Sequence, residues 1–168
     1  MMEIAGAALL LAGAAGFAMT LASAQRREMR MLRCLLHGLQ EMVWELKFRM
    51  TALPELCRIG ADAAGGPVRE ILGELSDRLS RNEVVDIAGS LNQILTCHEL
   101  PGRVRRNIRQ LGTSLGRFDL EGQLQGLELV KRQCRDDLRQ LENGGPQRIR
   151  NYQTIALCTA AALAILFI

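Results

Sequence analysis

Aromatic residues are scarce in this chain, which has one tryptophan, one tyrosine and four phenylalanines in 168 residues. Strands are normally rich in aromatic and β-branched residues, and no segment shows the period-two alternation of a half-buried strand. The apolar content of 48% is mostly aliphatic. The composition therefore predicts an all-α protein.

Residue groupings typical of catalytic or metal sites are also missing. The only histidines, His37 and His98, have no acid or nucleophile arranged beside them, and no phosphate-binding loop, zinc-protease or nucleophile-elbow motif occurs. Five cysteines are scattered singly, without a C-x-x-C pair, which fits buried thiols in a reducing compartment: Cys34, Cys57, Cys97, Cys134 and Cys158. We therefore expect no catalytic residue, no metal and no cofactor, and a protein that is not an enzyme.

Charged residues are absent from two long stretches at the ends of the chain, 4–24 and 152–168. A helix rises about 1.5 Å per residue and needs about 20 apolar residues to cross the hydrocarbon layer. The first stretch has that length, and the second, with 17 residues, is near the short limit. The sequence thus predicts a transmembrane helix over 4–24 and a C-terminal transmembrane helix over 152–168.

The residues that flank these stretches predict their orientation. Arg26, Arg27, Arg30 and Arg33 follow the first stretch, and two arginines shortly precede the second. Because basic flanks remain on the cytoplasmic side, both flanks predict the same arrangement. We expect a two-pass membrane protein with a cytoplasmic helical bundle over 25–145.

Each stretch also has an alternative interpretation. Ala22-Ser23-Ala24 satisfies a signal-peptide cleavage pattern, which would release a secreted helical protein. The residues before the stretch include no basic side chain, however, and the arginines after it resist translocation. The terminal stretch alternatively forms a buried core helix, although it lacks the polar face that such helices usually keep.

The body between the two stretches has the apolar periodicity of amphipathic helices, which must pack together. One long helix is expected to continue from the first stretch, with its buried stripe at Leu32, Leu36, Leu39, Val43, Leu46 and Met50. We expect Thr51 to cap the second helix, with Pro54 in its first turn, and Pro67 to begin the third.

Other residues predict the later boundaries. Asp119 is expected to cap the last helix of the body, and Asn143 to Pro146, the sequence NGGP, to interrupt it. Trp44 is either a core anchor or an interface residue, and we favour the core.

Charge is segregated along this body. Residues 51–100 carry eight acidic and four basic side chains, whereas residues 101–150 carry six acidic and eleven basic ones. A candidate basic interaction face comprises Arg103, Arg105, Arg106 and Arg109. Such a cluster meets anionic lipid, nucleic acid or an acidic protein, or is simply a solvated helix face. Nucleic acid is disfavoured because no stacking aromatics accompany the arginines.

Two segments resemble a known family. The sequence LGTSLGRFDLEGQ resembles the LG-x-x-LG-x-x-D-x-x-x-Q signature of the stage III sporulation protein AB family, through Leu111, Gly112, Leu115, Gly116, Asp119 and Gln123. The segment 39–56 is similar to the family's N-terminal block, with Glu45-Leu46, Phe48 and Thr51-Ala52-Leu53 at the matching positions. Ala52 departs from the proline of the family.

The resemblance carries expectations about function. It implies a component of the channel-like complex between mother cell and forespore, without catalysis, on the mother-cell side of the outer forespore membrane. It also implies a cytoplasmic domain similar to the F platform domains of type II secretion machines. By that analogy, the partners are a secretion-type ATPase and the membrane subunits of the same complex.

Our leading hypothesis is therefore a non-enzymatic membrane adaptor or platform subunit of that complex. The alternative is a bilayer-anchored basic module that binds anionic lipid or nucleic acid, with an affinity that falls steeply with salt. For the signature glycines, Gly112 and Gly116, we expect a structural role, in which both allow a neighbouring helix to approach closely.

Overall fold

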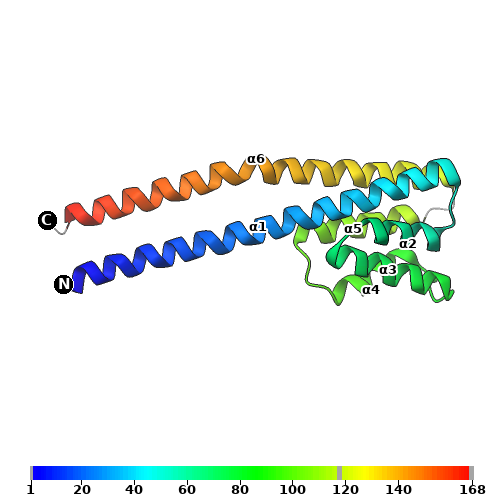
Figure 1. Ribbon diagram of the computed structural model, residues 1–168, viewed down its shortest axis with the longest axis horizontal. Helices are drawn as coiled ribbons and strands as arrows, with labels where there is room; N and C mark the ends of the chain where they lie inside the picture. The colour runs from blue at the N-terminus through cyan, green and yellow to red at the C-terminus, as the bar shows by residue number, and fades with distance from the viewer. Residues whose placement is uncertain (1, 117–118, 167–168) are drawn as a thin grey trace. The chain divides into compact units, whose positions relative to one another are not determined.

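The computed structural model describes the backbone of residues 2–116 and 119–166, and the side chains of residues 19, 20, 22–116 and 119–144. Within these ranges the chain forms six α-helices and no strand, which confirms the all-α prediction (Figure 1). The helices are α1 (Met2–Arg49), α2 (Leu53–Ala63), α3 (Gly66–Ser80), α4 (Ile87–Thr96), α5 (Gly102–Leu115) and α6 (Leu120–Leu166).

The chain divides into two compact units. One comprises Met1–Arg27 and Arg139–Ile168, and there Gln25 Nε2 donates a hydrogen bond to Leu141 O at 2.8 Å. The other, Glu28–Leu138, is the helical bundle. In the bundle α2 packs on α3 and α4 on α5, with further contacts between α3 and α4. As predicted, α1 is a single long helix.

The core of the bundle is aliphatic. On α1 it includes Leu32, Leu35, Leu39, Met42, Val43 and Leu46, and on α6 it includes Leu127, Val130 and Cys134. The Cys134 thiol donates to Leu32 O at 3.5 Å, which links α6 to α1. The predicted stripe was wrong at two positions. Leu36 is only half-buried, and Met50 is 72% exposed because α1 ends at Arg49 before the stripe reaches it.

Two glycines allow α1 and α2 to cross closely. A Cβ added at Gly38 of α1 would lie 2.7 Å from Gly60 O of α2. A Cβ at Gly60 would lie 2.6 Å from Met42 Sδ of α1. A third glycine, Gly126 of α6, meets Ser114 of α5, since its Cβ would lie 2.5 Å from Ser114 Cβ. Glycine therefore determines the helix separation at both crossings.

The helix boundaries agree only partly with the sequence predictions. Pro54 and Pro67 lie in the first turns of α2 and α3, as expected. The carboxylate of Asp119 accepts a hydrogen bond from Gly122 N at 2.7 Å and caps α6. The predicted break at 143–146 was wrong, because α6 continues as helix to Leu166.

Where side chains are described, no helix has a stretch long and apolar enough to cross a membrane. The predicted transmembrane segment 152–168 lies outside the residues with described side chains. The same is true of most of 4–24. Both segments therefore stay predictions.

Candidate interaction surface

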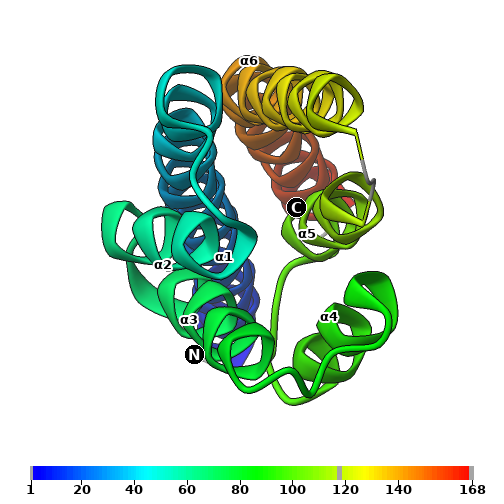
Figure 2. The ribbon, with the colours of Figure 1, turned by 90° about the vertical axis from the view of Figure 1, so that its right-hand side faces the viewer.

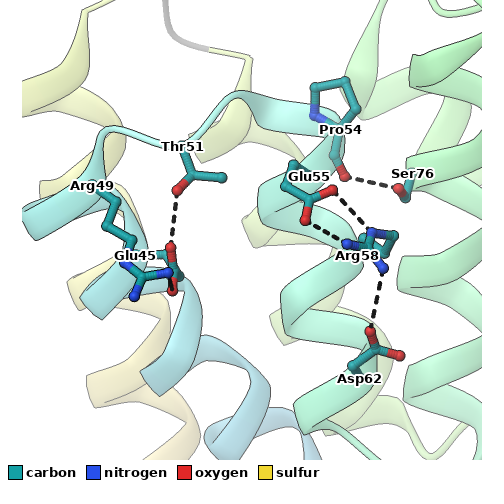
Figure 3. Close-up of polar contacts among 8 residues, drawn as sticks. All are labelled: Glu45, Arg49, Thr51, Pro54, Glu55, Arg58, Asp62 and Ser76. Carbon is teal, nitrogen blue, oxygen red and sulfur yellow. Dashed lines mark hydrogen bonds and ion pairs between the residues drawn. The ribbon is translucent and has the colours of Figure 1, made fainter.

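The junction between α1 and α2 is held by a buried carboxylate (Figure 3). Met50 adopts a left-handed conformation, with φ 50°, which ends α1. Glu45 is 7% exposed, and its Oε2 accepts a hydrogen bond from Thr51 Oγ1 at 3.0 Å. Its Oε1 lies 3.5 Å from Arg49 Nη1. Glu45 thus connects the last turn of α1 to the linker. Both Glu45 and Thr51 belong to the segment 39–56, which resembles the N-terminal block of the family.

The prediction that Thr51 caps α2 was wrong. The N-cap residue is Ala52, which has an extended conformation and no side-chain acceptor. The hydroxyl of Thr51 is instead bonded to Glu45, because a buried carboxylate needs a donor. The start of α2 is secured by another helix, since Ser76 Oγ of α3 donates to Pro54 O at 2.8 Å (Figure 3).

An ion-pair ladder follows on the outer surface of α2 (Figure 3). Arg58 Nε donates to Glu55 Oε2 at 2.9 Å, and Arg58 Nη1 lies 3.9 Å from Asp62 Oδ2. The hydrogen bond from Arg58 lowers the pKa of Glu55, and the same bond raises the pKa of Arg58. All three side chains are solvent-exposed, so the ladder contributes little to stability.

A second surface feature lies at the C-terminal end of α1. We call it the aromatic–cation patch and define it as five exposed residues: Trp44, Lys47, Phe48, Arg49 and Met50. The Trp44 and Phe48 rings are 46% and 64% exposed, with centroids 5.6 Å apart. Lys47 Nζ lies 5.6 Å from the Phe48 centroid, and Arg49 Cζ lies 5.3 Å from the Trp44 centroid. The assignment of Trp44 to the core was wrong, because the buried face of α1 is occupied by Leu39, Met42, Val43 and Leu46.

The four arginines of the predicted basic interaction face all lie on α5, but they bond groups of α4, of α6 and of the connection between α4 and α5. Arg106 Nη2 donates to both carboxylate oxygens of Asp137 on α6, at 2.9 and 3.0 Å, and Arg103 Nε lies 3.8 Å from Asp137 Oδ1. Arg105 Nη2 donates to His98 O, and Arg109 Nε donates to Asn92 Oδ1 at 2.9 Å. All four arginines therefore have intramolecular partners.

Asp137 is the centre of the contact between α5 and α6. It is 7% exposed and also accepts a hydrogen bond from Asn107 Nδ2 at 2.8 Å. Asn107 is itself buried. A buried carboxylate is stable only when it is paired and hydrogen-bonded, as it is here. Sequence reasoning missed this site, although the helical period could have found it. Asp137 follows the buried residues Val130 and Cys134 at helical spacing, whereas the exposed Asp136 does not.

The six signature residues all lie at the end of α5 and the start of α6. Leu111 and Leu115 are in the core, and Gln123 N donates to Asp119 O at 3.0 Å. A Cβ at Gly112 would lie 3.0 Å from Leu91 Cδ2 and 3.3 Å from Ala88 Cα, so α4 approaches α5 at this residue. Gly116 is the exposed C-cap of α5, and among described atoms a Cβ there would meet only Gly112 O, at 3.6 Å. The expectation of a close helix approach was right for Gly112 and wrong for Gly116.

Among the described side chains, no group of three or more His, Cys, Asp or Glu residues could hold a metal ion. Burial raises the pKa of the Cys57 thiol to about 12, and burial together with the charge of Asp137 raises that of Cys134 to about 12. Both thiols are therefore protonated and unreactive near neutral pH.

Together, these observations describe a protein whose elements of regular structure are all α-helices within residues 2–116 and 119–166. Its sequence matches the family model described as stage III sporulation protein AB (spore_III_AB) over residues 3–168. The chain therefore belongs to the stage III sporulation protein AB family, as the resemblance had predicted.

A solved structure gives the same fold. The chain is similar to the structure named "Stage III sporulation protein AB (SpoIIIAB)", with a TM-score of 0.61 and 20% sequence identity. The match covers 72% of this chain and 98% of that one. A comparison with curated proteins found no match.

Proposed function

We propose that this protein is a non-enzymatic membrane adaptor of the sporulation channel complex between mother cell and forespore. In this role the segments 4–24 and 152–168 anchor the chain, and the bundle docks a cytoplasmic secretion-type ATPase and neighbouring membrane subunits. The observation that carries the proposal is the extent of the family match. It covers residues 3–168, and so includes both uncharged ends together with the bundle.

The bundle itself is suited to such a role. Two part-buried polar contacts join its elements, since Glu45 of α1 bonds Thr51 of the linker and Asp137 of α6 bonds Arg106 of α5. Charged side chains remain exposed on this frame, among them Arg109 of α5. Rigid surfaces of this kind bind partners at a low entropic cost.

The cytoplasmic placement of the bundle predicts the labelling of its thiols. Cys97 is exposed, whereas Cys57 and Cys134 are buried with pKa values of about 12. A membrane-impermeant maleimide should label Cys97 in inverted membrane vesicles and not in intact cells, with the label located by mass spectrometry. The buried pair should react only after denaturation, which provides an internal control. Labelling of Cys97 in intact cells would contradict the proposed topology.

The docking proposal predicts that a charge reversal on the basic face weakens partner binding. Arg109→Glu is the most informative variant, because Arg109 is exposed and bonds only the side chain of Asn92 among the contacts described. Reversal at Arg106 would place a carboxylate against Asp137 and disturb the fold. We expect Arg109→Glu to reduce co-purification of the ATPase from sporulating cells by about tenfold.

The matched control for this experiment is Arg132→Glu, which reverses an exposed arginine on α6. Its membrane level and ATPase recovery should equal those of the unaltered protein. Equal recovery with Arg109→Glu and Arg132→Glu would remove the basic face from the docking proposal.

A further inference from the structure

The bundle exposes a second apolar feature besides the aromatic–cation patch, namely the connection between α3 and α4. We call residues 81–86 the valine loop. The side chain of Val85 in this loop is fully exposed to solvent. A single exposed apolar side chain is ordinary, but this one is presented by a backbone that is held on both sides.

Several hydrogen bonds hold the valine loop. Asn82, with φ 55°, donates its N–H to Leu79 O, and Glu83 N donates to Arg78 O at 3.1 Å. At the other end, the Asp86 carboxylate accepts from Ala88 N and Gly89 N and caps α4. The loop is therefore pre-organised, which lowers the entropic cost of binding through Val85.

The valine loop and the aromatic–cation patch are complementary in charge. The loop carries Glu83, Asp86 and Arg81, a net charge of −1, whereas the patch carries the cations Lys47 and Arg49 beside its rings. A symmetric contact between two copies of the patch would place cations against cations. The patch is better matched to an apolar side chain flanked by carboxylates, which the loop provides.

The positions of the two features suit contact between parallel copies. Within the bundle, the end of α1 and the connection between α3 and α4 lie at the same end (Figure 1). Viewed from that end, they lie on different sides of the bundle (Figure 2). Two different patches at one level generate a head-to-tail contact, which forms a ring or a row of copies that all point the same way.

We propose that the aromatic–cation patch of one copy binds the valine loop of a second copy, so that copies of this chain assemble head to tail. Val85 packs against the exposed faces of Trp44 and Phe48, and Glu83 lies near Lys47. The contact is small, and therefore weak between two isolated copies. Membrane anchoring of both copies would raise their effective concentration and strengthen it.

The test uses two variants of the full chain, each of which disables one feature. Trp44→Ser/Phe48→Ser removes the patch, and Glu83→Lys/Val85→Ser removes the loop. All four side chains are exposed, so the fold should persist, as circular dichroism would check. We expect the unaltered chain to form dimers and larger species in concentrated detergent solution, measured by analytical ultracentrifugation. Each variant alone should associate about tenfold more weakly or not at all.

A mixture of the two variants distinguishes a head-to-tail contact from any other. The intact loop of the first variant binds the intact patch of the second, and the disabled features then block further growth. The mixture should therefore form dimers with one copy of each variant and no larger species. Leu129→Ser, which replaces an exposed leucine on α6, is the matched control and should associate like the unaltered chain.

Several outcomes would overturn the proposal. They are a monomeric unaltered chain in both concentrated detergent and lipid vesicles, unchanged association of either variant, and a mixture that does not form dimers. Disulfide trapping of Phe48→Cys against Val85→Cys gives an independent measurement in vesicles. A dominant product between two copies of Phe48→Cys would show a symmetric contact instead, and would also overturn the proposal.

Discussion

Replacing Gly112 by leucine should lower the free energy of unfolding by about 2 kcal/mol, because the new side chain has no room between α5 and α4. Its Cβ alone would lie 3.0 Å from Leu91 Cδ2 and 3.3 Å from Ala88 Cα. The second contact involves backbone, which cannot move without shifting α4. Leucine also gains about 0.8 kcal/mol of helix propensity over glycine, and this gain is included in the net value.

Gly116→Leu is the matched control, since it makes the same substitution four residues later. Gly116 has φ −75°, which any residue adopts, and it is exposed at the C-cap. We expect a change within about 0.5 kcal/mol there. Denaturant unfolding of the full chain in detergent, followed by circular dichroism, measures both values. Equal losses at the two glycines would show that the close approach of α4 is not what requires Gly112.

Replacing Asp137 by alanine should also be strongly destabilising, by about 2 kcal/mol, since it removes the shared acceptor between α5 and α6. Asp137 accepts hydrogen bonds from Arg106 and Asn107, and Asn107 Nδ2 then retains only the Arg103 carbonyl. Arg106→Ala should cost less, about 1 kcal/mol. The Arg106 side chain is 66% exposed, and Asn107 still bonds the carboxylate.

A double-mutant cycle tests whether the two residues act through each other. The double variant Arg106→Ala/Asp137→Ala should lose less stability than the sum of the two single losses, because each single change already breaks their hydrogen bonds. Asp136→Ala, at the exposed neighbouring acid, is the control and should change stability by less than about 0.5 kcal/mol. Strict additivity of Arg106 and Asp137 would show that the ion pair does not contribute.

Three of the helix boundaries predicted from local chemistry were correct. Pro54, Pro67 and Asp119 act within one turn of their own position, so their effect can be read from neighbouring residues. The errors at Thr51 and Trp44 have a different origin. Thr51 is bonded to a glutamate six residues away, and the side of α1 that holds Trp44 is decided by which leucines the other helices cover.

The break predicted at residues 143–146 shows a further limit. Glycine and proline disfavour a helix interior by local preference, yet α6 continues through them. Local propensity is a weak guide where tertiary context decides the outcome. The division of the basic face is a similar case, since spacing places four arginines on one helix but does not show which acid or carbonyl each will bond.

The sequence by itself determined the all-α class, the continuous first helix, the helix starts at Pro54, Pro67 and Asp119, and the family, because these depend on period, local chemistry and a short signature. Only the tertiary structure decided that Asp137 is a buried shared acceptor, that Gly112 but not Gly116 meets another helix, and that Trp44 and Val85 are exposed. The physical reason is that burial and pairing are properties of two surfaces at once. A pattern along one helix describes only one of them.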